Sequence, residues 1–125
     1  DKYFQTDGLE IELGSGVGFF KQLRKNIITS DVRKGIEFDM FLDATEMNLE
    51  DRSVKCFFAI NVFHHISHPT KFFDELIRVL KKDGGCILIE PHNGFLSRFL
   101  HKNIHKDEYF DVNEVEWDKL EKKGI

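Results

Sequence analysis

The chain has 125 residues, enough for one domain with a hydrophobic core. Hydrophobic residues make up 41% and charged residues 32%, and 13 phenylalanines supply large apolar side chains, which excludes a disordered or fibrous protein. The net charge of −4 and the lack of a basic run argue against nucleic acid as a partner. No stretch approaches the roughly 18 consecutive apolar residues of a membrane span, so we expect a soluble, cytoplasmic protein with no membrane partner.

The first predicted element is a strand that runs into a glycine-rich loop. Hydrophobic residues alternate with glutamates over residues 9–13, and the loop follows as Gly14-Ser15-Gly16-Val17-Gly18. Phe19, Phe20 and Leu23 predict a short helix. A second strand over residues 26–31 ends on Asp31, and a weaker third strand over residues 38–42 ends on Asp43 and Ala44.

The next segment predicts a buried strand, a helix and another strand. The apolar run within residues 55–62 is typical of a parallel strand covered on both faces. A helix begins at Pro69 with Ser67 as its cap, and Lys81, Lys82 and then Gly84-Gly85 are expected to end it. Its apolar positions are Phe72, Phe73, Leu76, Ile77 and Leu80. A strand over residues 86–89 and an amphipathic helix marked by Phe95, Leu96, Phe99 and Leu100 complete the series.

Strands that alternate with helices predict an α/β fold with a doubly wound, mainly parallel sheet. Such sheets bind ligands at the carboxyl ends of their strands. Cys56 and Cys86 each lie in an apolar run, where a thiol usually behaves as a small buried hydrophobe. Neither has a Cys or His partner at ligand spacing, so no metal site is expected.

Two strand ends predict a ligand site together. Glycines let the backbone of the loop after the first strand pass close to a ligand. Asp31 lies 17 positions after Gly14, near the ~20-residue offset at which an acid accepts hydrogen bonds from ribose hydroxyls. The loop reads G-x-G-x-G, with Phe19 where the dinucleotide fingerprint G-x-G-x-x-G requires its last glycine, and this spacing disfavours NAD.

Taken in order, these motifs resemble those of class I S-adenosylmethionine-dependent methyltransferases, in particular the small-molecule methyltransferase group. The resemblance rests on Glu12 to Gly18, Asp31, Asp43-Ala44, Asn61-Val62-Phe63-His64-His65, Arg78-Val79-Leu80-Lys81 with Gly84-Gly85, and Glu90-Pro91. It covers about residues 8–92. It implies a Rossmann-like fold, S-adenosylmethionine as cofactor, and one methyltransferase-like domain over residues 1–125.

The resemblance also implies which residues bind the cofactor. Glu12 and the loop that contains Gly14, Ser15, Gly16 and Gly18 would hold the methionine moiety. Asp31 would hold the ribose. Asp43 and Ala44 would read the adenine, and Asn61 and Val62 would line the pocket beside the sulfonium.

The acceptor is expected to be a small molecule or a glycan precursor. A sulfonium methyl is already electrophilic, so the transfer needs no catalytic triad, and we assign no catalytic residue. His64, His65 and His92 lie near predicted strand ends, where a base for an oxygen acceptor could work, although a structural or pocket-wall role is the simpler interpretation of each. Arg98 belongs to a polar cluster that could face an anionic acceptor.

The sequence departs from the family pattern at several places, one of which is Lys82-Asp83-Gly84-Gly85, where the family favours a proline before the glycines. Glu10 is a charged residue within the first strand, only residues 32–36 separate the second and third strands, and residues 107–125 do not clearly supply the antiparallel edge strands. We therefore expect a fold that lacks part of the C-terminal antiparallel edge, as a truncated domain would. Two other functions stay open: a non-catalytic cofactor-binding or scaffold module of the same fold, and a disfavoured NAD-dependent oxidoreductase.

Overall fold

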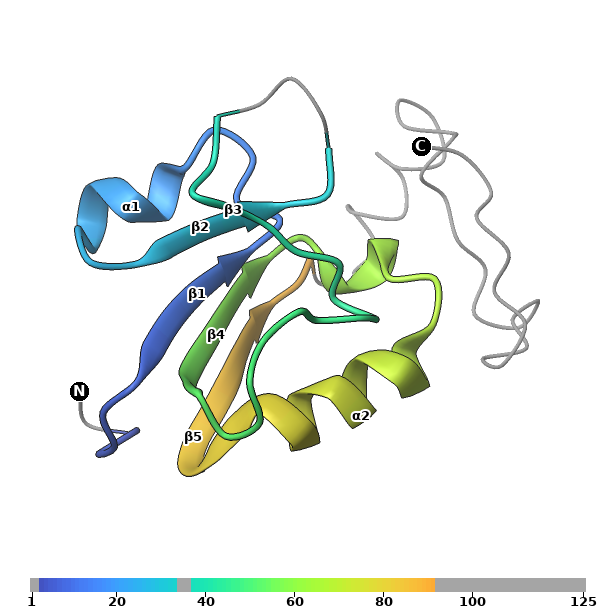
Figure 1. Ribbon diagram of the computed structural model, residues 1–125. Helices are drawn as coiled ribbons and strands as arrows, with labels where there is room; N and C mark the ends of the chain where they lie inside the picture. The colour runs from blue at the N-terminus through green and yellow to red at the C-terminus, as the bar shows by residue number, and fades with distance from the viewer. Residues whose placement is uncertain (1–2, 34–36, 92–125) are drawn as a thin grey trace.

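A computed structural model describes residues 3–33 and 37–91, which form one sheet with helices against it (Figure 1). The five described strands lie in the order β3-β2-β1-β4-β5, and all four pairings are parallel. The doubly wound parallel sheet is thus confirmed. The strands are β1 (Leu9–Leu13), β2 (Ile28–Asp31), β3 (Met40–Phe41), β4 (Val54–Ile60) and β5 (Leu80–Ile89), and the helices are α1 (Phe19–Leu23), α2 (Pro69–Val79) and the 3-10 turn η1 (Phe63–His65).

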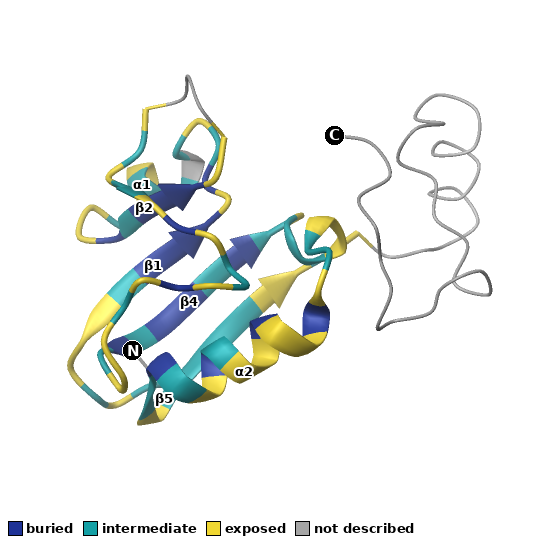
Figure 2. Cartoon of the chain, turned by 45° about the vertical axis from the view of Figure 1, so that its right-hand side comes forward, coloured by how far each residue is buried: buried dark blue, intermediate teal, exposed yellow. Residues whose placement is uncertain are grey.

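Each face of the sheet packs against a different helix, because successive side chains of a strand point to opposite faces. Phe57 of β4 packs with Phe72 of α2 in the hydrophobic core. Its neighbour Phe58 instead contacts Phe20 of α1, with the ring centroids 4.9 Å apart. Figure 2 shows buried positions along β1, β2 and β4 and at intervals along α2. The core consists of Ile11, Leu13, Leu42, Met47, Val54, Phe57, Ala59, Phe72, Leu76 and Val79.

Helix α2 begins with Pro69, whose missing amide proton costs nothing in a first turn. Its N-cap is His68, whose carbonyl accepts from the amide of Phe72 at 3.1 Å, so the expected cap at Ser67 is wrong. The apolar stripe is also narrower than its sequence spacing indicates. Pro69, Phe72, Leu76 and Val79 are buried, whereas Phe73 and Ile77 are exposed. None of the described helices is long and apolar enough to cross a membrane.

Arg78 of α2 ties down the segment between β3 and β4. Its guanidinium donates to the carbonyl oxygens of Met47 at 2.7 Å and Leu49 at 2.8 Å. It also pairs with the carboxylates of Glu75 at 2.9 Å and Asp51 at 2.8 Å. These bonds hold the chain that leaves the third strand against the core, where Met47 and Leu42 are buried.

The expected end of α2 at the two glycines is wrong, because the helix ends at Val79 and Leu80 already begins β5. Leu80 pairs with Val54 and Gly85 with Cys56, so β5 has extra residues between two positions of the ladder. A Cβ on Gly84 would lie 2.6 Å from the carbonyl oxygen of Lys55. Glycine is therefore needed here for the close approach of two strands.

The third strand is shorter than expected. Only Met40 and Phe41 pair, in parallel, with Ser30 and Asp31 of β2. Asp39 lies beside this pairing and accepts hydrogen bonds from the amide and hydroxyl of Thr29, both at 2.9 Å. The expected helix near residues 95–100, the two acceptor-side candidates His92 and Arg98, and residues 107–125 lie outside the described residues.

The two cysteines are free, and only one of them is fully buried as expected. Cys56 is buried and Cys86 is half-buried. Burial raises the pKa of the Cys56 thiol to about 11 and that of the Cys86 thiol to about 12. Both therefore behave as apolar side chains of the sheet.

Candidate functional site

The glycine loop joins the carboxyl end of β1 to α1 in a conformation that favours glycine. Gly14 has φ +58° and Gly16 has φ +53°, both in the left-handed region that L side chains rarely adopt. A Cβ on Gly14 would also lie 2.7 Å from Cγ2 of Val62. The loop therefore lies directly against Val62, the second residue after β4, as expected for two strands whose carboxyl ends meet at one edge.

Ser15 anchors this loop to the neighbouring strand. Its hydroxyl and its amide both donate to the carbonyl oxygen of Ser30, at 3.0 and 2.9 Å. The serine is buried, and its carbonyl accepts from the amide of Gly18 at 2.8 Å. The hydroxyl of Ser15 thus holds the shape of the loop, and its expected contact with a ligand stays a prediction.

Asp31 lies at the end of β2 with its carboxylate turned toward the loop. It accepts from the amide of Gly16 at 3.1 Å and from the amide, Nε and Nη2 of Arg33 at 2.9, 3.1 and 2.9 Å. Burial by itself raises the pKa of Asp31, but the hydrogen bonds from Arg33 and Gly16 outweigh it and lower the pKa to about 2. The buried group is therefore an anion at neutral pH.

Glu12 is the second acid of the site and has a different environment. Its side chain points from β1 toward α1 and is 4% exposed, and its Oε2 is buried without a hydrogen-bond partner among the described residues. Burial raises the pKa of Glu12, and a hydrogen bond from the amide of Phe20 only partly opposes this. A buried acceptor without a partner is costly, so a group that donates a hydrogen bond would stabilise it.

Asp43 and Ala44 form a turn after the third strand. The carboxylate of Asp43 accepts from the amide and hydroxyl of Thr45, both at 2.8 Å, and Asp43 itself is exposed. Ala44 is half-buried against the core. The amide of Leu42 donates to the carbonyl oxygen of Asp31 at 3.3 Å, which places this turn next to the end of β2.

The end of β4 is held to the end of β5 by Glu90. Its Oε1 accepts from the amides of Val62 at 3.0 Å and Phe63 at 2.8 Å, and its Oε2 lies 2.5 Å from Nδ1 of His64. Burial raises the pKa of Glu90, but the hydrogen bond from His64 and those from the two amides lower it overall. Glu90 therefore fixes both the backbone after β4 and the ring of His64.

His65 and Asn61 complete this end of the strand. The ring of His65 lies 4.0 Å from that of His64, between centroids. Asn61 is exposed with φ +56°, and its amide donates to the carbonyl oxygen of Ile89 at 2.8 Å. Asparagine is one of the few residues that adopt this backbone conformation readily.

The structure joins most of the expected site residues through a series of contacts along one edge of the sheet. Asp31 contacts Gly16, Gly14 lies against Val62, and Val62 is bonded to Glu90. Arg33 and Glu90 were not among the expected site residues. Glu90 comes directly after β5, and Asp31 is the last residue of β2, so the same strand-end pattern could have identified Glu90. No local pattern indicates the contact of Arg33 with the carboxylate of Asp31.

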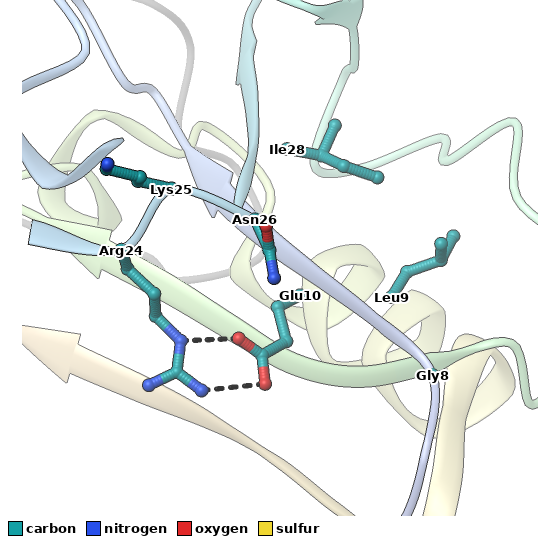
Figure 3. Close-up of a pocket in the computed structure, with 7 residues that line it drawn as sticks. All are labelled: Gly8, Leu9, Glu10, Arg24, Lys25, Asn26 and Ile28. Atoms are coloured by element: carbon teal, nitrogen blue, oxygen red, sulfur yellow. Dashed lines mark hydrogen bonds and ion pairs between the residues drawn. The ribbon is translucent and has the colours of Figure 1, made fainter. Parts of the chain in front are cut away.

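A pocket of about 450 Å³ lies elsewhere, at the amino ends of β1 and β2 (Figure 3). Its lining includes Glu10, which pairs with Arg24 at 2.5 and 2.8 Å and with Lys55 at 2.9 Å. These partners explain how a charged residue fits within β1. The hydrogen bond from Arg24 lowers the pKa of Glu10 to about 2, because its effect is larger than the opposing effect of burial. The pocket is separate from the glycine loop, since it adjoins the opposite ends of the same strands.

Several solved structures share this fold. A solved S-adenosylmethionine-dependent methyltransferase of Thermotoga maritima, described as a possible histamine N-methyltransferase, is 25% identical with a TM-score of 0.67. The match covers 86% of this chain and 56% of that one. A protein of Pyrococcus horikoshii is 23% identical with a TM-score of 0.63, over 84% of this chain and 55% of its own. The chain thus spans little more than half the length of these two relatives.

A third structure, an S-adenosylmethionine-dependent methyltransferase of Aquifex aeolicus, is 22% identical with a TM-score of 0.57, over 74% of this chain and 64% of its own. A search of curated proteins found no significant match. The family model described as "Methyltransferase domain" matches residues 19–88, more than half of the chain. With the parallel sheet, the glycine loop and the acid at the end of β2 in place, the chain belongs to this methyltransferase domain family and has the fold of S-adenosylmethionine-dependent methyltransferases.

Proposed function

We propose that the chain binds S-adenosylmethionine at the carboxyl ends of β1, β2 and β4 and serves to methylate a small molecule or glycan precursor. The observation that supports this best is Oε2 of Glu12, which is buried two residues before the glycine loop and has no hydrogen-bond partner among the described residues. The α-ammonium group of the cofactor is a charged donor of the kind that such an oxygen needs. The group therefore fits the residues present.

The other contacts follow from the same geometry. Asp31 is an anion that can accept hydrogen bonds from two ribose hydroxyls in exchange for the two that it accepts from the guanidinium of Arg33. Asp43 and Ala44, in the turn beside Asp31, would contact the adenine. Val62, which lies against Gly14, and its neighbour Asn61 would line the region of the sulfonium.

When bound, the cofactor would supply an electrophilic methyl group that passes to a nucleophilic acceptor atom, with the thioether S-adenosylhomocysteine as the leaving group. The chain contributes position, since holding donor and acceptor in line can supply roughly 7–11 kcal/mol of a barrier. Glu90 keeps the backbone of Val62 and the ring of His64 fixed beside this region. We infer that His64 and His65 line the acceptor side, and that His64 can take a proton from an oxygen acceptor.

The test is calorimetric titration of the full chain with S-adenosylmethionine, S-adenosylhomocysteine and adenosine, with NAD as control. Asp31→Ala should weaken all three adenosine ligands, whereas Glu12→Gln should weaken only those that contain the methionine moiety. Gly16→Val should abolish binding, because a branched side chain cannot adopt φ +53° without strain. Asp74→Ala removes an exposed acid of α2 and should change nothing.

Micromolar binding with this pattern would support the site and justify an acceptor screen with S-adenosylhomocysteine release as readout. The description of the Thermotoga relative is a reason to include histamine in the screen. Absence of binding to any adenosine ligand would refute the cofactor site. Binding without turnover for every acceptor would favour the non-catalytic module, and binding of NAD alone would favour the oxidoreductase.

A further inference from the structure

Arg33 pairs with the carboxylate to which the proposed function assigns the ribose. Its Nε donates to Oδ1 of Asp31 at 3.1 Å and its Nη2 donates to Oδ2 at 2.9 Å. The side chain of Arg33 is 54% exposed, whereas that of Asp31 is 2% exposed. An exposed guanidinium thus covers a buried carboxylate.

The same guanidinium also reaches the glycine loop. A Cβ on Gly16 would lie 3.3 Å from Nη2 of Arg33, and the amide of Gly16 donates to Oδ2 of Asp31. Arg33 therefore lies between the end of β2 and the loop that follows β1. These are the two elements between which the proposed cofactor site is built.

The hydrogen bonds of Asp31 leave no room for a further donor. A carboxylate offers about four lone-pair directions. Asp31 accepts one bond from the amide of Gly16, one from the amide of Arg33 and two from the guanidinium. Two ribose hydroxyls can bind this carboxylate only if the guanidinium withdraws.

We propose that Arg33 sets the affinity of the site by competing with ribose hydroxyls for the carboxylate of Asp31. The proposal rests on the proposed function, because it concerns the same site. When a ligand with a ribose binds, Asp31 loses two hydrogen bonds from the charged guanidinium and gains two from hydroxyls. The site therefore binds the ligand less tightly than it would if Arg33 did not pair with Asp31. The ion pair re-forms when the ligand leaves, which favours release of the spent cofactor.

The experiment measures binding of three ligands to the parent chain and to Arg33→Met, which keeps an unbranched side chain without donors. The ligands are S-adenosylhomocysteine, adenosine and 2′,3′-dideoxyadenosine. Arg33→Met should bind the first two at least about tenfold more tightly, since a hydrogen bond to a charged group is worth at least that factor. Binding of the dideoxy ligand should not change, because it has no hydroxyl to donate.

Controls separate local competition from a general charge effect. Lys71→Ala removes one positive charge from an exposed position of α2 and should leave all affinities unchanged. In an Asp31→Ala background, Arg33→Met should give no gain. If Arg33→Met does not fold by circular dichroism, Arg33→Lys, which keeps the charge but loses the two-pronged geometry, should give a smaller gain of the same sign.

The outcomes are distinct. Equal or weaker binding of adenosine by the folded Arg33 variants, with the parent still binding, would overturn the role of Arg33 and leave the cofactor site standing. A gain that persists for the dideoxy ligand, or without Asp31, would overturn it as well. Failure of the parent and of every variant to bind any of the ligands would overturn the proposed function and this inference together.

Discussion

Gly14→Ala should destabilise the chain through two separate effects. Gly14 has φ +58°, and a residue with a Cβ pays roughly 1–2 kcal/mol for this conformation. The new Cβ would also lie 2.7 Å from Cγ2 and 3.1 Å from Cγ1 of Val62, and overpacking of this kind costs about 1–3 kcal/mol. We therefore expect the free energy of unfolding to fall by about 2–5 kcal/mol.

Urea unfolding followed by circular dichroism measures the loss, and the chain offers a matched control. Gly18 has φ +71°, but the nearest atom to a Cβ there is 3.9 Å away, so Gly18→Ala should cost only the conformational part, roughly 1–2 kcal/mol. Val62→Ala should rescue Gly14→Ala by removing the clashing methyl groups, and a double-mutant cycle isolates this coupling.

Two results would refute the reasoning. One is a cost for Gly14→Ala no greater than that for Gly18→Ala, which would mean that Val62 moves aside freely. The other is an absence of coupling between Gly14 and Val62 in the cycle. Titration with S-adenosylhomocysteine on the same variants would show whether the packing of this loop also controls ligand affinity.

Three further outcomes follow from the described contacts. The free energy of unfolding should fall by about 3 kcal/mol as pH drops from about 4.5 toward 2, because the pKa of Glu10 is about 2 in the folded chain against an ordinary 4.5, so that the unfolded chain takes up the proton first. Acid titration of stability should show that Glu10→Gln lacks this fall. The same pH profile in Glu10→Gln as in the parent would contradict the role of Glu10. Glu90→Ala should cost about 1–3 kcal/mol in urea unfolding because two amides lose their acceptor, and Glu90→Gln, which retains an oxygen, should cost less; equal costs would exclude this role. Phe72→Ala should lower the free energy of unfolding by about 3–5 kcal/mol, whereas its exposed neighbour Phe73 should tolerate alanine with a much smaller loss, and similar losses would argue against the observed orientation of α2.

Local sequence determined the main elements of this protein. The alternation in β1, the apolar run of β4 and Pro69 at the start of α2 each depend on neighbours a few residues away, and each forms close to its expected place. Because parallel strands end at a common edge, the same pattern also indicated that the glycine loop and Asp31 would lie together, and they are in contact.

Long-range packing decided the features that local pattern did not predict. Gly84 looked like the end of a helix but allows β5 to approach the carbonyl of Lys55. Glu10 looked misplaced in a buried strand, yet Arg24 and Lys55 neutralise its charge.

At the candidate site, the sequence by itself determined which residues lie at the strand ends, because the hydrophobic pattern indicates where each strand ends. Only the tertiary structure decided their partners. Within residues 3–33 and 37–91, Glu12 has a buried oxygen without a hydrogen-bond partner, the guanidinium of Arg33 pairs with the carboxylate of Asp31, and Glu90 holds the backbone after β4. The physical reason is that a hydrogen bond or a steric contact forms only when two atoms lie at the right distance to within a few tenths of an ångström. Strand register and helix packing across the whole sheet set these distances.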